Sequence, residues 1–266
     1  MQVTHPQAGW NGIPAENVFI ATDDLGSEAG RGYVIYQYQP HLYPDCPVNI
    51  YFSLDWRASG SFMLFGALIA RARQLRDSNP GVRARVYTCI APDDEGARAF
   101  FEHGGMNCDD REVLLRLPIP EAPGRIPMNC DVVPCPLNTP EEVNGLIQRM
   151  QQNDITHLTA EDLNSLRFTP HFRALGLSCG GYLAGEALLC GSGPECELAA
   201  LYISEPYRRR GLAKALLNRC MAMMAQEGVT SFTGRFVTRS LPQKQLALSF
   251  KALDLGTSAV FPSIFL

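Results

Sequence analysis

The stretch "ELAALYISEPYRRRGLAKALL", residues 197–217, runs from a strand through a turn into a helix. Three arginines and a glycine precede the N-terminus of that helix. A helix N-terminus presents free N–H groups and is the positive end of the dipole, so cationic side chains there indicate that an anion is expected. Gly211 and Ala213 are small enough to let a phosphate approach the backbone. The stretch predicts an anion cradle; the alternative is a solvated basic turn before a core helix.

Two other phosphate-binding motifs do not fit this stretch. A Walker A loop is excluded, because the sequence has no G-x-x-x-x-G-K-S/T. A Rossmann fingerprint is also poor, because the preceding apolar runs at 172–178, 182–190 and 196–204 are short and separated by glycine-rich turns. Such runs predict an antiparallel meander instead of a parallel βαβ unit.

The surrounding sequence predicts further elements. A proline-rich seam at residues 116–140 leads into a short strand, and Thr139 and Thr159 are the expected caps of two helices. After the helix that follows Gly211, we expect a strand at 229–237, a helix begun by Pro242 and a last strand within 257–266. The order is strand, helix, helix, three strands, helix, strand, helix, strand.

The composition of the 266 residues is ordinary for a globular protein, with 46% hydrophobic and 19% charged residues. The net charge of −4 gives no general attraction to nucleic acid or an anionic membrane. The nine cysteines include no C-x-x-C pair, and the five histidines lack a paired metal-ligand spacing. With neither a signal peptide nor a membrane-spanning run apparent, we expect a soluble cytoplasmic protein with reduced thiols and no metal.

These residues carry a resemblance. Residues 197–217 are similar to the acyl-CoA-binding motif Q/R-x-x-G-x-G/A of the GNAT N-acetyltransferase superfamily, and the element order over 128–266 resembles that fold. Gly185 resembles the glycine of the family's third strand. The resemblance implies acetyl-CoA or coenzyme A as co-substrate. It assigns backbone groups of Leu201 and Ile203 to the pantetheine arm, and to the pyrophosphate it assigns the N–H groups of Arg208, Arg209, Arg210, Gly211, Leu212 and Ala213.

The resemblance also implies a general base. Transfer to an amine needs a neutral nitrogen, and Glu197 matches the family's glutamate, acting directly or through a water. The period of two predicts that Glu197 shares a strand face with Leu201 and Ile203. The alternatives are that Glu197 is a strand carboxylate paired with an arginine, or that Glu195 is the base.

The general acid departs from the family pattern. In "QKQLALSFKALDL" Phe250 stands where the family's later motif has a tyrosine that protonates the leaving thiolate. Phenylalanine has no proton to give. Tyr202, Tyr207 or a water is then the acid, or coenzyme A leaves as the thiolate.

The N-terminal half resembles a second copy of the family. Residues 48–75 repeat the strand, turn and helix, with Arg57-x-x-Gly60-x-Phe62 at the cradle. Phe62 replaces the small residue, and the half has no room for a first strand and two helices. We therefore expect a degenerate, truncated copy that does not bind acyl-CoA; the alternative is that Phe62 turns aside.

The expected fold is α/β, of the α+β type, with two GNAT-like domains that each have a mixed, mostly antiparallel sheet flanked by helices. The expected domains are 1–118, a proline-rich linker at 119–127, and 128–266. The expected function is acyl-CoA-dependent N-acyl transfer, most simply of acetyl, to a small-molecule or peptide amine; the alternative is a non-catalytic acyl-CoA-binding or scaffold protein. We expect no nucleic-acid or membrane partner, and a monomer in preference to an oligomer.

Overall fold

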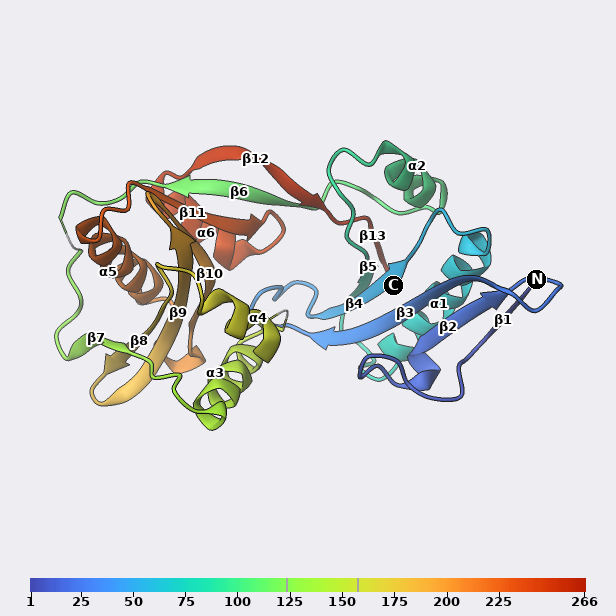
Figure 1. The fold of residues 1–266 in the computed structure, drawn as a ribbon, viewed down its shortest axis with the longest axis horizontal. Helices are drawn as coiled ribbons and strands as arrows, with labels where there is room; N and C mark the ends of the chain where they lie inside the picture. The colour runs from blue at the N-terminus through green and yellow to red at the C-terminus, as the bar shows by residue number, and fades with distance from the viewer. Residues whose placement is uncertain (123, 157) are drawn as a thin grey trace. The chain divides into compact units, whose positions relative to one another are not determined.

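The computed structural model describes residues 1–122, 124–156 and 158–266. The chain forms two compact units (Figure 1): unit 1 is Met1–Glu112 with Thr257–Leu266, and unit 2 is Val113–Gly256. Each unit has a mixed, mostly antiparallel sheet with helices packed on it. The predicted fold class is therefore confirmed.

The sheet of unit 1 has the strand order β1-β2-β3-β4-β5-β13. Strands β2, β3 and β4 form an antiparallel meander, and β5 returns parallel to β4. Helices α1 and α2 pack on one face, with Phe52, Leu64 and Phe101 in the core between them. The elements are β1 (Gln2–Thr4), η1 (Ala15–Asn17), β2 (Val18–Thr22), β3 (Glu28–Tyr38), β4 (Val48–Leu54), α1 (Ser61–Arg76), β5 (Ala84–Tyr87), α2 (Glu95–His103) and β13 (Ser263–Phe265).

The sheet of unit 2 has the order β12-β6-β11-β10-β9-β8-β7. Helices α5 and α6 contribute to the core on one face, and α3 and α4 to the core on the other. The elements are β6 (Arg111–Leu117), β7 (Cys130–Pro134), α3 (Pro140–Gln152), α4 (Ala160–Leu166), β8 (Arg173–Cys179), β9 (Tyr182–Ser192), β10 (Glu195–Ile203), η2 (Glu205–Tyr207), α5 (Leu212–Gln226), β11 (Ser231–Val237), α6 (Leu241–Phe250) and β12 (Leu253–Val260).

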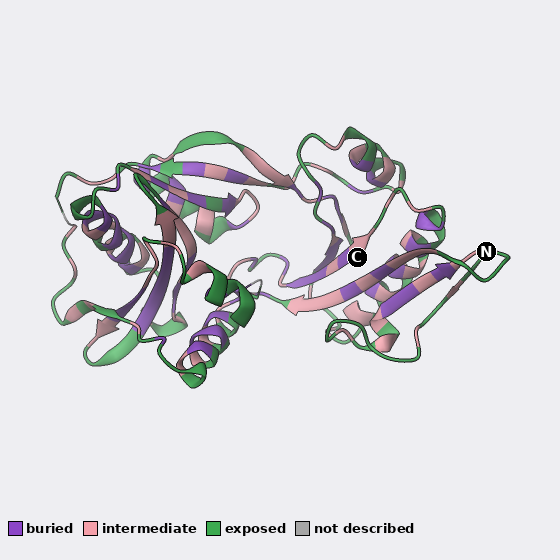
Figure 2. Ribbon diagram, in the orientation of Figure 1, coloured by how far each residue is buried: buried purple, intermediate pink, exposed green. Residues whose placement is uncertain are grey.

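The helices of unit 2 begin where their caps predict. Thr139 and Glu142 form a capping box at α3, and Thr159 and Asp162 form one at α4. The apolar positions of α5 line its buried side (Figure 2), since Leu212, Leu216, Leu217, Cys220 and Met224 are at most 4% exposed. The predicted meander is also present, because β8 pairs antiparallel with β9 and β9 with β10.

The C-terminal stretch differs from the expected single strand. It forms two strands, β12 in the sheet of unit 2 and β13 in the sheet of unit 1, where β13 pairs antiparallel with β5. Conversely, β6 precedes the proline-rich segment in the chain, yet lies between β12 and β11. The compact units divide at residues 112 and 256, whereas the expected domains divide at 118 and 128. The difference arises because β6 pairs with strands that are distant from it in the sequence.

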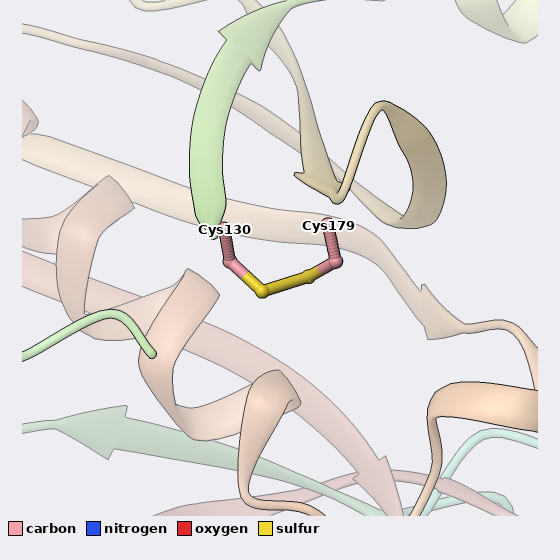
Figure 3. The surroundings of a disulfide bond; sticks show 2 residues. All are labelled: Cys130 and Cys179. Carbon is pink, nitrogen blue, oxygen red and sulfur yellow. A yellow bond between two sulfur atoms is a disulfide. The ribbon is translucent and has the colours of Figure 1, made fainter. Parts of the chain in front are cut away.

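One pair of cysteines contradicts the expectation of reduced thiols. Cys130 on β7 and Cys179 on β8 are direct cross-strand neighbours and form a disulfide (Figure 3). Their Cα atoms are 4.1 Å apart. The expectation was wrong because it considered spacing along the chain, whereas strand register places residues 49 positions apart side by side.

The described helices are too short or too polar to cross a lipid bilayer. Across the described ranges, every helix falls short of the length and apolar character that a membrane span demands.

Candidate active site

The site begins where β10 and β11 separate. Within the described chain, their parallel pairing covers Glu195–Leu198 on β10, whereas β10 stays paired with β9 as far as Ile203. Ser204 donates its N–H to the carbonyl of Ala184, 2.9 Å away. Because hydrogen bonding alternates along an antiparallel pair, the N–H and C=O groups of Leu201 and Ile203 point away from β9, toward the side where pairing with β11 has ended. The role of these groups as pantetheine contacts stays a prediction.

A β-bulge in β10 corrects one prediction. The register with β9 shifts between Leu198 and Ala200, so that Ala199 is an extra residue. The period of two is broken at this point. Glu197 therefore shares a face with Ala200 and Tyr202, and the prediction that it shares one with Leu201 and Ile203 was wrong.

The turn after β10 exposes a row of backbone donors. Arg208 donates its N–H to Glu205, and the next donor along the chain to a backbone carbonyl is Ala215, which bonds Gly211 at 3.0 Å. Among the described residues, the N–H groups at positions 209–214 thus have no backbone acceptor, and they lie at the positive end of α5. These donors include the predicted pyrophosphate ligands from Arg209 to Ala213.

Gly211 gives this turn its shape. Its φ of +73° is left-handed, and it is the N-terminal cap of α5. A Cβ at this position would meet no atom within 4 Å. The glycine is therefore required by its backbone conformation, and the space beside it is open.

The three arginines of the turn divide into two groups. Arg208 is partly buried: its Nε donates to the carbonyl of Ile203 at 2.6 Å, and its Nη2 donates to Oδ1 of Asn153 at 2.9 Å. Burial lowers the pKa of Arg208. The prediction that the Arg208 N–H holds the pyrophosphate is not met, because this N–H already donates to Glu205. Arg209 and Arg210 are exposed, with the Arg210 guanidinium 5.9 Å from the ring centre of Tyr207.

Glu197 has a cationic partner on the neighbouring strand. Arg235 of β11 lies with Nη1 2.8 Å from Oε1 of Glu197, and both side chains are partly exposed, at 53% and 29%. This is the ion pair that the sequence analysis left open as the alternative. The role of Glu197 as general base stays a prediction.

Tyr202 belongs to a buried polar cluster that the sequence analysis did not find. Its hydroxyl donates to Glu186 on β9, which is fully buried. Arg149 on α3 grips the Glu186 carboxylate with two hydrogen bonds, of 2.7 and 3.0 Å, and the Cys135 thiol donates to it at 3.3 Å. Burial and Glu186 raise the pKa of Tyr202, and the same causes raise the pKa of Cys135 to about 12. A lone glutamate within the apolar run 182–190 was the available signal, since a buried carboxylate requires partners.

The cluster predicts a stability effect. Arg149→Ala removes the cationic partner of the Glu186 carboxylate and leaves a buried charge. Because the Arg149 side chain is 40% exposed, water replaces part of the interaction, and we expect a loss of about 2 kcal/mol in the free energy of unfolding. Urea denaturation measures it. Arg219→Ala, at an exposed position of α5, is the control; equal losses in both variants contradict the prediction.

Two residues named in connection with the general acid, Phe250 and Tyr202, are both buried. Phe250 is 6% exposed and belongs to the core beneath α6. Tyr202 is 5% exposed, and its hydroxyl is engaged by Glu186. The assignment of Tyr202 as catalytic remains a prediction, and this contact is an observation against it.

The corresponding turn of unit 1 is closed. Gly60 has a φ of −88°, and a Cβ on it would lie 2.5 Å from Cβ of Ala21. The Gly60 N–H donates to Ala29 and the Ser61 N–H to Ala58, both at 3.0 Å. Phe62 is 62% exposed and contacts Phe100 with tilted rings, whose centres are 4.8 Å apart. This turn therefore lacks the row of free donors found before α5.

Outside Pro123 and His157, which the structure does not describe, no group of three or more His, Cys, Asp or Glu side chains is arranged to hold a metal ion.

Comparison with known proteins agrees with this geometry. Residues 145–242 match the family model described as the acetyltransferase (GNAT) family. Among curated proteins, no sequence matches the chain. The stretch from within α3 to the start of α6 is therefore similar to a GNAT-family domain.

Solved structures resemble the chain at low identity. A probable N-acyltransferase of Enterococcus faecalis, described as a conserved protein of unknown function, is 11% identical, with a TM-score of 0.57 over 92% of this chain and 61% of that chain. A GCN5-related N-acetyltransferase of Sphaerobacter thermophilus is 15% identical, with a TM-score of 0.48 over 96% and 83%. A tandem GNAT protein from the clavulanic acid biosynthesis pathway is 15% identical, with a TM-score of 0.47 over 93% and 82%. At these identities the E. faecalis likeness concerns the fold alone.

Proposed function

We propose that the protein transfers an acyl group, most simply acetyl, from acyl-CoA to the nitrogen of a small-molecule or peptide amine. The row of N–H groups at 209–214, beside the separated strands β10 and β11, is the observation that carries this proposal. The open space beside Gly211 fits a phosphate group. Leu201 and Ile203 would hold the pantetheine arm, and residues 209–213 the pyrophosphate.

The remaining chemistry is assigned to this chain's side chains. Bound acyl-CoA supplies the acyl group as a thioester, which the amine attacks with formation of a C–N bond and release of the thiolate. Glu197 takes the proton from the amine nitrogen, directly or through a water. Arg235 fixes Oε1 of Glu197, so the proposal assigns the proton to Oε2. We assign no side chain to protonate the thiolate, because Tyr202 is engaged by Glu186.

One site is proposed for each chain. The N–H groups of Gly60 and Ser61 are already bonded within unit 1, and Phe62 stands where a phosphate would need space. We propose that unit 1 does not hold acyl-CoA and that the protein works as a monomer.

Two features of the site also fit a second function. The Glu197–Arg235 pair and the apolar Phe250 are also compatible with a protein that binds acyl-CoA without turning it over. Release of free thiol from acetyl-CoA in the presence of a broad amine panel distinguishes the two functions, because binding without thiol release favours the second.

Gly211→Glu tests the cradle. A carboxylate placed beside the N–H groups repels a phosphate and strains the left-handed φ, so we expect coenzyme A affinity to fall about thirtyfold. Calorimetric titration measures the affinity, with a stoichiometry near one for the wild type. Gly211→Asn is the matched control, since asparagine tolerates a left-handed φ and adds no charge. Wild-type affinity for coenzyme A in Gly211→Glu would contradict the assignment of this turn as the phosphate site.

A further inference from the structure

Arg208, in the turn before α5, links the end of β10 to the end of α3. Its guanidinium joins the end of β10, through the Ile203 carbonyl, to Asn153, the C-terminal cap of α3. Asn153 in turn donates from Nδ2 to the carbonyl of Arg149, at 2.9 Å. A continuous chain of hydrogen bonds therefore connects the turn before α5 to the last turn of α3.

The far end of this chain is fixed in the interior. Arg149 holds the fully buried carboxylate of Glu186 through both of its oxygens. The Tyr202 hydroxyl donates to the same carboxylate, so β9, β10 and α3 meet at one group. A fully satisfied buried network of this kind has little freedom to move.

The location of the guanidinium explains how one of the three arginines before α5 is accommodated. A cation is unfavourable at the N-terminus of α5, but the Arg208 side chain turns to the C-terminus of α3, where the dipole is negative. Its planar fork reaches two acceptors in different directions, which neither lysine nor glutamine can reproduce.

We propose that Arg208 is a positioning residue: it holds the turn 204–211 in its anion-accepting conformation by bridging β10 and the C-terminus of α3, with Arg149 and Glu186 as the fixed base of the bridge. The consequence for coenzyme A rests on the proposed function. The consequence for the turn itself does not.

The turn can be tested without any ligand. Asn153→Ala removes one end of the bridge, and Asn144→Ala, at an exposed position on the same helix, is the matched control. In limited digestion with trypsin, we expect the cleavage rate after Arg209 or Arg210 to rise about tenfold in Asn153→Ala and to stay at the wild-type value in Asn144→Ala. Cleavage after Arg219, which lies within α5, serves in the same digest as the reference for unfolding of unit 2.

Coenzyme A binding tests the same bridge by a double-mutant cycle. We expect calorimetric affinity to fall about tenfold in Asn153→Ala and about thirtyfold in Arg208→Gln, with the double variant no weaker than Arg208→Gln. If Arg208 instead contacts the anion directly, Asn153→Ala keeps wild-type affinity, which overturns the proposal.

The outcomes separate the two proposals. No binding of coenzyme A by the wild type overturns the acyl-CoA site, while the tryptic comparison still decides the role of the bridge. Equal cleavage after Arg209 in Asn153→Ala and Asn144→Ala overturns the positioning role whatever the titration gives.

Discussion

Glu197→Gln is expected to lower kcat about a thousandfold while coenzyme A affinity stays within about twofold of the wild type. Glutamine keeps the size of the side chain and its contact with Arg235, but it accepts no proton from the amine, and general base catalysis contributes roughly 10²–10⁴ in rate. Thiol release at saturating acetyl-CoA and amine measures kcat, and titration calorimetry measures the affinity.

Two controls accompany this variant. Glu195→Gln changes the exposed neighbour on β10 that the sequence left as the alternative base, and we expect its kcat to remain near the wild-type value. Arg235→Gln removes the partner without removing the carboxylate, and we expect a loss smaller than tenfold. If Glu197→Gln keeps a third or more of the activity, Glu197 is a strand carboxylate paired with Arg235 and the base lies elsewhere.

Removing the disulfide is expected to have the largest effect on stability. The bond between Cys130 and Cys179 closes a loop with a sequence separation of 49. In the chain-entropy treatment, a cross-link of this span restricts the unfolded state by about 4 kcal/mol. We therefore expect the double variant Cys130→Ser/Cys179→Ser to lose about that much free energy of unfolding, measured by urea denaturation under oxidising conditions.

Reduction supplies the matching control. Wild-type protein in dithiothreitol is expected to unfold at the same urea concentration as the double variant, and the double variant is expected not to respond to dithiothreitol. Cys89→Ser, at an exposed free cysteine, controls for the substitution itself. Nine titratable thiols in the unreduced, denatured wild type would contradict the disulfide.

Local signals predicted the elements of unit 2 well. The caps at Thr139 and Thr159, and the apolar period of α5, depend on residues within a few positions of one another. The same holds for the turn at Gly211, whose left-handed φ needs a residue without a Cβ. These features can be predicted because each depends on residues that are close together in the sequence.

Features that depend on register were not predictable. The bulge at Ala199 moved Glu197 to the other face of β10, and no residue type marks it in the sequence. Asn153 and Arg149 come from α3 and Glu186 from β9. The packing of α3 on the sheet brings Asn153 to Arg208, and the pairing of β9 with β10 brings Glu186 to Tyr202. The disulfide was missed for the same reason.

The pairing of β13 with β5 has a consequence for synthesis. Phe265 lies opposite Arg85, so the sheet of unit 1 gains its last strand only after residue 265 has left the ribosome. Until then β5 presents an unpaired edge, and such edges promote association between nascent chains. The sheet of unit 1, whose strands β1 to β5 are synthesised before unit 2, is thus completed only after unit 2 has been made.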